Sequence, residues 1–283
     1  MTYRELTARI RKAIGEEPEA QAVVRMILEL GVGVSWADAL CGALDHLPSA
    51  DQKRLATIVE QVESGTPVQY AIGQTTFCNR LFEVQPAVLI PRPETEELCR
   101  WIVEDHSSSI PHSPLRLLDI GTGSGCIAIT LALDLPQAHV DAIDISEEAL
   151  AVARRNASRL GAEVVFHQMD ILAPLWEDKR GISLIVSNPP YICECEKADM
   201  APHVLNHEPS QALFVPDNDP LLFYRAIAHF AQATLKPAGE LYFEVNALYA
   251  EEVKKLLIAM GYRQVVVRKD AFGKPRFVKA VYG

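Results

Sequence analysis

From Leu115 to the end of the chain, short apolar segments of strand length alternate with longer segments of helical periodicity. Apolar segments of this length predict buried strands, and strands that alternate with helices form a mostly parallel sheet covered on both faces. We therefore expect an α/β domain with about seven strands over residues 111–283. Strands are predicted at 115–119, 139–144, 163–167, 182–187, 240–245, 265–268 and 277–282, and helices at 124–133, 147–160, 221–235 and 250–260.

The first 72 residues carry only helical patterns. Leu6 and Ile10 begin an apolar stripe with a spacing of four, and a 3.6-residue period resumes after Pro18. Serines that can act as N-caps precede two further apolar segments. Residues 1–72 are therefore predicted to form a small all-α domain. The expected N-caps are Ser35 and Ser49, before helices at 36–40 and 50–62.

Residues 73–110 are expected to connect the two domains. Residues 75–84 alternate apolar and polar side chains around Asn79 and Arg80, which is typical of a β-hairpin. The segment 90–97 reads Ile-Pro-Arg-Pro-Glu-Thr-Glu-Glu. Proline and acidic residues are favoured in the first turn of a helix, so a helix is expected to begin there. The Ser- and Pro-rich segment 107–114 is predicted to be a connection.

A glycine-rich turn follows the first strand of the α/β domain. Its glycines are spaced G-x-G-x-G, and Cys126 stands where a dinucleotide-binding turn has its last glycine. Such a turn allows close approach of the backbone to a ligand, but a pyrophosphate would need the helix N-terminus opposite it. The spacing disfavours an NAD oxidoreductase and favours the sulfonium amino acid S-adenosylmethionine, with Asp119 suited to its ammonium group. The expected contacts are Asp119, Gly121, Thr122, Gly123, Ser124 and Gly125.

Two further acidic residues end predicted strands of this domain. Asp144 ends the second strand, where a carboxylate can accept hydrogen bonds from ribose hydroxyls, although it could instead cap the helix that starts near Ser146. Asp170 ends the third strand and could accept from an adenine amino group, although aspartate is also common in turns. Ile171 could pack on the adenine ring. All three residues are predicted to bind the cofactor.

The fourth strand of the domain runs into Asn188-Pro189-Pro190-Tyr191. Two prolines make a rigid turn, which is the purely structural interpretation of this stretch. A turn does not require an asparagine and an aromatic residue around the prolines, however, and the carboxyl end of a parallel strand is where ligands bind. We therefore interpret residues 188–191 as the catalytic segment, with Asn188 also near the cofactor.

The residue types of this segment suit methylation of a planar nitrogen. The lone pair of such a nitrogen is delocalised, so acceptors aimed at its two hydrogens would orient it and favour positive charge on it. The side-chain oxygen of Asn188 and the carbonyl of Pro189 can be these acceptors. Tyr191 offers a flat face for stacking.

Composition limits the classes of binding partner and the cellular location that we expect. The formal net charge is −10, which disfavours a protein that coats nucleic acid. No apolar run approaches the roughly 18 residues of a membrane span, and the N-terminal segment lacks the apolar region of a secretory signal. A cytoplasmic monomer that acts on a protein or a small molecule is expected, without direct nucleic-acid or membrane binding.

No metal site is expected. Cys193 and Cys195 form a single C-x-C pair without a second pair, and His203 and His207 lie outside a zinc-like context. The six cysteines show no disulfide-like regularity. The last turn, at 272–277, is predicted to be a hairpin with solvated basic side chains. These basic residues are Lys274 and Arg276.

These motifs together resemble the HemK/PrmC family of glutamine methyltransferases. The resemblance covers nearly the whole chain, and Ile90–Glu96 is its most specific segment, whereas Asn-Pro-Pro-Tyr is shared with adenine-N6 methyltransferases. In the family an aromatic residue often stands at the position of Ile171. The other matching segments are 65–70, 119–125, 188–191, 208–209 and 243–245.

The resemblance implies a Rossmann-like class I methyltransferase sheet and a protein substrate. The family methylates the side-chain amide of the glutamine in the Gly-Gly-Gln motif of peptide-chain release factors, and its helical N-terminal domain helps to hold the release factor. Three alternatives stay open at this point: a glutamine methyltransferase of a ribosomal protein, an adenine-N6 methyltransferase of DNA or RNA, and a cofactor-binding subunit without activity. The last is disfavoured because Asn188 and the turn glycines are all present.

Overall fold

The computed structural model describes residues 1–15, 17–107, 115–176 and 181–283. The predicted connection at 107–114 therefore lies, from residue 108 onward, outside the described residues. The chain divides into two compact units, each with its own core. Unit 1 comprises residues 1–75, 83–86 and 200–208, and unit 2 comprises residues 76–82, 87–199 and 209–283.

Unit 1 is helical, as the periodicity predicts. Leu6 and Ile10 are fully buried in its core. Ser35 caps its helix through a bond from the backbone N–H of Asp38, but Ser49 is the first residue of its helix, so its predicted N-cap role is wrong. Pro48 takes the cap position instead. The elements of unit 1 are α1 (Tyr3–Ile14), α2 (Glu17–Met26), η1 (Ile27–Gly31), α3 (Trp36–Leu40), η2 (Ala43–His46), α4 (Ser49–Glu63), α5 (Val68–Ile72) and α9 (Pro202–His207).

A β-hairpin follows α5. It consists of β1 (Gln74–Phe77) and β2 (Arg80–Glu83). Its turn is centred on Cys78 and Asn79, one residue earlier than predicted, because both adopt positive φ (46° and 59°). A two-residue hairpin turn of type I′ requires positive φ at both central positions, and asparagine tolerates this conformation well.

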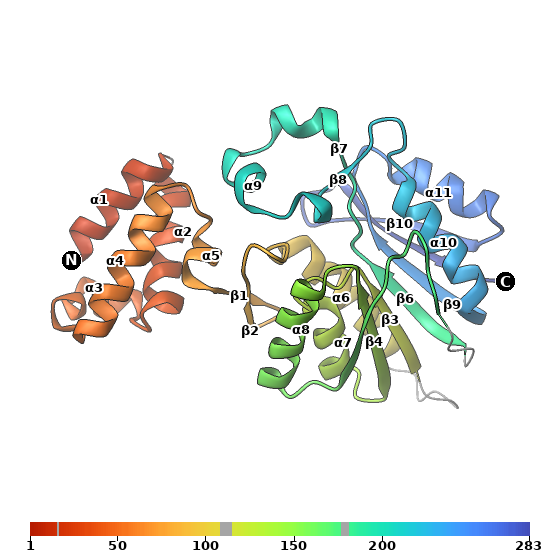
Figure 1. Ribbon diagram of the computed structural model, residues 1–283, viewed down its shortest axis with the longest axis horizontal. Coiled ribbons are helices and arrows are strands. Elements are labelled where there is room, and N and C mark those ends of the chain that lie inside the picture. The colour runs from red at the N-terminus through yellow and green to blue at the C-terminus, as the bar shows by residue number, and fades with distance from the viewer. Residues whose placement is uncertain (16, 108–114, 177–180) are drawn as a thin grey trace. The chain divides into compact units, whose positions relative to one another are not determined.

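A seven-stranded sheet forms the centre of unit 2 (Figure 1). Its strand order is β10-β11-β9-β6-β3-β4-β5. Within this sheet β11 runs antiparallel to both neighbours, and the other neighbouring strands pair in parallel, which confirms the predicted α/β class. The strands are β3 (Leu115–Ile120), β4 (Ala138–Asp144), β5 (Val164–Gln168), β6 (Ile182–Ser187), β9 (Leu235–Glu244), β10 (Arg263–Lys269) and β11 (Pro275–Val281).

Helices cover both faces of this sheet (Figure 1). Successive side chains of a strand point to opposite faces, so Leu117 belongs to the core on one face, the first core, and Leu118 to the core on the other face, the second core. The hairpin aromatic residues Phe77 and Phe82 pack into the first core. One face carries α6 (Pro93–His106), α7 (Cys126–Asp134) and α8 (Glu147–Leu160), and the other carries α10 (Leu222–Thr234) and α11 (Ala250–Ala259).

The strand register aligns the carboxyl ends of the central strands at one edge. Ile120 pairs with Ile143 of β4 and with Ser187 of β6, and Ser187 pairs with Phe243 of β9. This edge also carries a small parallel pair, β7 (Ile192–Cys193) and β8 (Phe214–Val215), with the short helices η3 (Glu194–Asp199) and η4 (Ser210–Ala212) next to it in the chain. Ligands of such sheets bind beyond the carboxyl ends of the strands.

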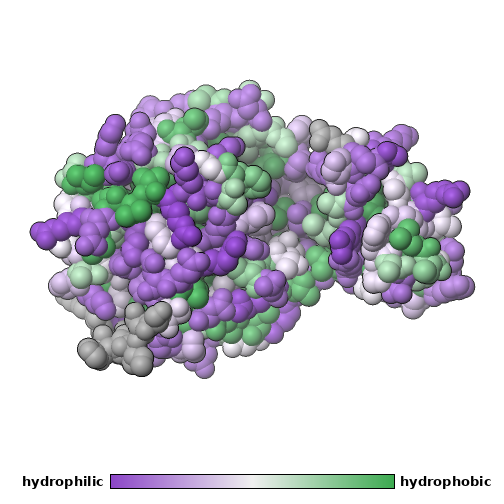
Figure 2. Space-filling view, turned by 180° about the vertical axis from the view of Figure 1, so that it is seen from behind, coloured by the Kyte–Doolittle hydropathy of each residue, from purple (hydrophilic) through white to green (hydrophobic). Residues whose placement is uncertain are grey.

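Figure 2 shows hydrophilic side chains over much of one face, with hydrophobic residues in smaller groups. Among the described helices, none combines the length and the apolar character that crossing a membrane requires.

Candidate active site

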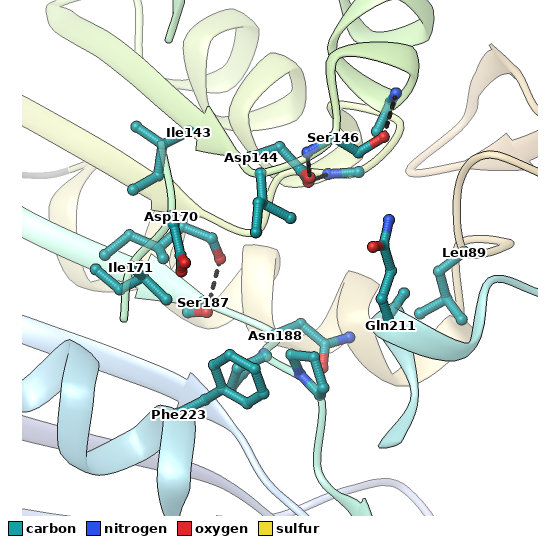
Figure 3. Close-up of a pocket in the computed structure, with 18 of the residues that line it drawn as sticks. Leu89, Ile143, Asp144, Ser146, Asp170, Ile171, Ser187, Asn188, Gln211 and Phe223 are labelled. Carbon is teal, nitrogen blue, oxygen red and sulfur yellow. Dashed lines mark hydrogen bonds between the residues drawn. The ribbon is translucent and has the colours of Figure 1, made fainter. Parts of the chain in front are cut away.

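A cavity lies at the carboxyl edge of the sheet in unit 2 (Figure 3). In Figure 3, Asp144 and Ser146 border it on one side and Asn188 and Phe223 on another, while Asp170 and Ile171 lie between them. The lining comes mainly from the segments that follow β3, β4, β5 and β6. It includes Gly121, Gly123, Asp144, Ser146, Asp170, Ile171, Asn188, Pro189 and Pro190.

The glycine-rich turn presents backbone to the cavity. Gly121 and Gly123 line it, and both have positive φ (74° and 55°), which favours glycine. The N–H groups of Gly121 and Thr122 donate to the carbonyl of Ile143, at 2.9 and 3.0 Å. These hydrogen bonds therefore join the turn to the end of β4 and restrict its backbone conformation beside the cavity.

Asp119 lies beneath this turn and is fully buried, and it is not among the residues that line the cavity. Its Oδ2 accepts hydrogen bonds from Thr122 Oγ1 (2.6 Å) and from the N–H of Ala128 (3.2 Å). Burial raises the pKa of this carboxyl to about 7, against the opposing effect of these two bonds. Its Oδ1 is buried and has no hydrogen-bond partner in the structure. Buried polar atoms in proteins are nearly always paired, so this unpaired oxygen calls for an explanation.

Three of the predicted cofactor contacts lie behind the turn and do not line the cavity. Thr122 and Ser124 are buried, and the carbonyl of Ser124 accepts from Asn156 Nδ2 at 3.0 Å. A side chain at Gly125 would meet Ile129 and Ala153, because this glycine lies where α7 and α8 pack together. These residues shape the turn rather than its cavity-facing surface.

Asp144 lines the cavity, and its carboxylate also accepts hydrogen bonds from two neighbouring segments that line the cavity. Its Oδ2 accepts from the N–H of Gly123 (2.8 Å), and its Oδ1 accepts from the N–H of Ser146 (2.9 Å). The helix that follows is capped by Ser146 itself, whose side chain accepts from the N–H of Ala149. Burial raises the pKa of the Asp144 carboxyl, while its backbone hydrogen bonds lower it.

Asp170 and Ile171 also line the cavity. The third strand ends at Gln168, so Asp170 lies in the turn after it and not at the strand end as predicted. Its Oδ1 accepts from the N–H of Leu172 at 2.8 Å, which is the turn bond that short acidic side chains often make. Ile171 packs at the edge of the second core.

Only part of the predicted catalytic segment, residues 188–191, lines the cavity. Asn188, Pro189 and Pro190 line the cavity, whereas Tyr191 does not. Tyr191 is half-buried against the second core, and its hydroxyl donates to Glu244 Oε1 at 3.1 Å. Burial and the neighbouring charge of Glu244 both raise the pKa of this hydroxyl.

Several lining residues have no motif in the sequence that predicts them. They come from three places: the segment before the Ile90–Glu96 stretch, the segment after Glu208-Pro209, and α10. The residues from the first two places lie close in sequence to segments that resemble the family. This closeness is the one sequence feature that could have predicted that they line the cavity. The residues are Ala87, Val88, Leu89, Gln211, Ala212, Phe223 and Ile227.

The cysteine and histidine candidates make local contacts. Cys193 Sγ lies 3.4 Å from the hydroxyl of Tyr249, and His207 Nδ1 lies 3.1 Å from the carbonyl of His203. Among the residues that the structure describes, no group of three or more His, Cys, Asp or Glu could hold a metal ion. Arg276, predicted to be solvated, is largely buried instead, because its guanidinium donates to the carbonyl of Val245 (3.3 Å).

Comparison with known proteins agrees with this architecture. Residues 111–254 match the methyltransferase domain family, and residues 3–73 match the PrmC N-terminal domain. A solved structure, the human methyltransferase 10 domain containing protein, shows the same fold, with 18% identity, a TM-score of 0.51, and coverage of 71% of this chain and 88% of that one.

Curated relatives extend the match to almost the full length. A release factor glutamine methyltransferase of Bacteroides thetaiotaomicron is 44% identical over 278 residues, which are 97% of this chain and 98% of that protein. A release factor glutamine methyltransferase of Bacillus subtilis is 38% identical over 268 residues, 94% of this chain and 93% of that protein. These matches cover both domains of this chain, and the chain therefore belongs to the HemK/PrmC family of release factor glutamine methyltransferases.

Proposed function

We propose that the chain transfers a methyl group from S-adenosylmethionine to the side-chain amide nitrogen (N5) of the glutamine in the Gly-Gly-Gln motif of peptide-chain release factors. The observation that carries this proposal is the shared cavity. Asn188 and Pro189 line it together with Gly121, Gly123 and Asp144. A methyl donor held by the glycine turn would therefore lie next to two acceptors suited to an amide.

The residues around the cavity fit S-adenosylmethionine. Gly121 and Gly123 offer backbone at close range, Asp144 offers a carboxylate toward ribose hydroxyls, and Asp170 and Ile171 offer an acceptor and an apolar surface toward adenine. The unsatisfied oxygen of Asp119 suits the ammonium group. When bound, the cofactor supplies a methyl group that its sulfonium already activates.

The chain's own task is then to hold the nitrogen in line with that methyl group. The Asn188 side-chain oxygen and the Pro189 carbonyl can each accept one N–H of the substrate amide. Two fixed acceptors restrict the orientation of the nitrogen and favour the positive charge that grows on it. Tyr191, which follows directly, is proposed to offer its ring to the substrate amide.

The choice of a release factor as substrate rests on the relatives and on charge. Two relatives named release factor glutamine methyltransferase match the chain over nearly its full length. The formal net charge of −10 disfavours the adenine-N6 alternative. We further propose that the helical unit helps to bind the release factor and that the enzyme acts in the cytoplasm as a monomer.

A transfer assay tests this function. The protein is mixed with purified release factor and radiolabelled S-adenosylmethionine, and the assay is repeated with the Gly-Gly-Gln glutamine replaced by alanine. Label is expected on the intact release factor only, and mass spectrometry should place one methyl group on that glutamine. Isolated ribosomal proteins serve as a competing substrate. Label that survives the replacement, or preferential labelling of a ribosomal protein, would contradict the proposal.

The Asp119→Asn variant tests the proposed ammonium site. Asparagine keeps an oxygen that can accept from Thr122 and Ala128, so folding should be retained, but the negative charge is lost. We expect the Kd for S-adenosylmethionine to rise by about tenfold to a hundredfold, because a hydrogen bond to a charged group contributes about 1.5–3 kcal/mol. Isothermal titration calorimetry measures this affinity.

The same site predicts a pH dependence. Because the pKa of Asp119 is raised to about 7, the carboxylate gains its charge as the pH rises through that value. Wild-type affinity for S-adenosylmethionine should therefore increase between pH 6 and pH 7.5, roughly the range in which a group with this pKa ionises, and Asp119→Asn should lack the increase. Equal affinities of the two proteins across this range would exclude the ammonium contact.

A further inference from the structure

The hydroxyl of Thr95 lies between the catalytic asparagine and a buried carboxylate. Thr95 Oγ1 donates to Glu244 Oε2 at 2.7 Å, and Asn188 Nδ2 donates to Thr95 Oγ1 at 3.3 Å. Thr95 and Glu244 are 2% and 1% exposed, so water does not substitute for these partners. The three side chains form a chain of hydrogen bonds that ends at the cavity.

The strand register explains why these residues meet. Ser187 ends β6 and pairs with Phe243 of β9, so Asn188, directly after β6, and Glu244, the last residue of β9, each follow a member of this pair. Thr95 reaches them from the first turn of α6, which begins at Pro93. Three segments far apart in the sequence are thus joined behind one wall of the cavity.

The number of hydrogens available determines which group donates in each of these hydrogen bonds. A threonine hydroxyl has one hydrogen, and an ionised carboxylate can only accept. Because the Thr95 hydroxyl donates its one hydrogen to Glu244, it can only accept a hydrogen bond from Asn188. The NH2 group of the Asn188 amide must therefore point at Thr95. The Asn188 side-chain oxygen is then the atom left for the substrate.

We infer that Glu244 and Thr95 are positioning residues that orient the Asn188 amide, so that it offers its oxygen and not its NH2 group to the substrate nitrogen. This inference rests on the proposed function, because it assumes that Asn188 accepts from a substrate N–H. An Asn188 amide turned the other way would place a donor against a donor and exclude the nitrogen from its productive position.

Glu244 also holds the other end of the catalytic segment. Its Oε1 accepts from the hydroxyl of Tyr191 at 3.1 Å, so one carboxylate restrains both Asn188 and Tyr191. The charged groups near it are Arg276 of β11 and Glu94 of α6. Arg276 is itself held by Asp270 (3.5 Å) and by the Val245 carbonyl.

Protonation of Glu244 would remove the restraint on the orientation of the Asn188 amide. Burial raises the pKa of Glu244, Glu94 raises it further, and Thr95, Tyr191 and Arg276 lower it. A protonated Glu244 can donate to Thr95, whose hydrogen is then free to point at Asn188 and turn the amide round. The orientation therefore depends on the ionised carboxylate and is lost as the pH falls through the pKa of Glu244.

Two substitutions at Thr95 separate its hydroxyl from its shape. Thr95→Val keeps the volume and removes the hydroxyl, whereas Thr95→Ser keeps the hydroxyl. We expect Thr95→Val to lower kcat for release-factor methylation by about tenfold to a hundredfold, the range that a misplaced catalytic group can cost. Thr95→Ser should restore kcat to within about threefold of wild type, with KM for the release factor and Kd for S-adenosylmethionine nearly unchanged in both variants.

The pH profile gives a readout that a merely structural role would not change. Wild-type kcat should fall at acid pH, as Glu244 takes up its proton. In Glu244→Gln the amide can donate to Thr95 at any pH, so kcat should be low throughout and this acid limb should be absent. Calorimetric binding of S-adenosylmethionine and thermal unfolding of each variant show that the fold is kept.

The outcomes separate this inference from the proposed function. Wild-type kcat in Thr95→Val, together with an inactive Asn188→Ala, would overturn the positioning role and leave the proposed function standing. An active Asn188→Ala would instead remove the acceptor role on which both rest. A parallel loss of kcat and of S-adenosylmethionine binding in Thr95→Val would also overturn the inference, because it would indicate a collapse of the cavity.

Discussion

Asn188→Ala is expected to abolish multiple-turnover methylation of the release factor, leaving only a residual rate that single-turnover measurement detects, while S-adenosylmethionine still binds. The substitution removes the acceptor that fixes one N–H of the substrate amide and leaves the glycine turn and Asp144 in place. Loss of one such preorganised group costs about a hundredfold to a thousandfold in kcat. Single-turnover transfer of a radiolabelled methyl group measures this loss, and calorimetry measures the cofactor affinity.

Asn218→Ala is a matched control for this experiment. Asn218 is exposed, lies between β8 and α10, and is not among the lining residues of the cavity. Exposed substitutions of this kind usually change stability by less than about 0.5 kcal/mol, so its kcat should equal that of wild type. Normal turnover in Asn188→Ala would contradict the acceptor role. Loss of cofactor binding in that variant would show that the asparagine acts first on the cofactor.

The fold could be predicted because its signals are local. Each buried strand is a short apolar run and each helix has a 3.6-residue period, so the sheet class follows from their alternation. The predicted strand at 240–245 begins later than β9 does, because the first residues of β9 contain Pro237 and Gly239 and carry a register shift against β6. Ala238 even adopts a positive φ of 59° there. Such an irregular strand has no periodic pattern.

The site could be predicted only where it coincides with strand ends. Gly121, Asp144 and Asn188 stand at the carboxyl ends of β3, β4 and β6, which are neighbours in the sheet, and parallel pairing gathers these ends at one edge. Spacing along the chain does not show which side of a turn faces the ligand, so it could not separate Gly123 from Gly125. The contact between Thr95 and Glu244 joins residues 149 positions apart, and only the folded chain brings them together.

Gly125 illustrates a residue whose importance lies in packing. Its φ is +81°, and a Cβ built on it would lie 2.8 Å from Ile129 Cδ1 and 3.1 Å from Ala153 Cβ. Both neighbours are fully buried, so neither can move freely. Alanine at this position therefore combines backbone strain with overpacking between α7 and α8.

We expect Gly125→Ala to lower the free energy of unfolding of the methyltransferase domain by about 3 kcal/mol, the sum of left-handed strain and of a methyl group forced into a packed interior. Gly161→Ala is the matched control, because Gly161 has a similar φ of +70° but no atom within 4 Å of the added carbon. Strain alone should cost it about 1 kcal/mol. Urea denaturation followed by circular dichroism gives both values. Equal losses in the two variants would show that the packing of α7 on α8 tolerates a side chain at 125, and that the turn needs glycine there for its backbone conformation alone.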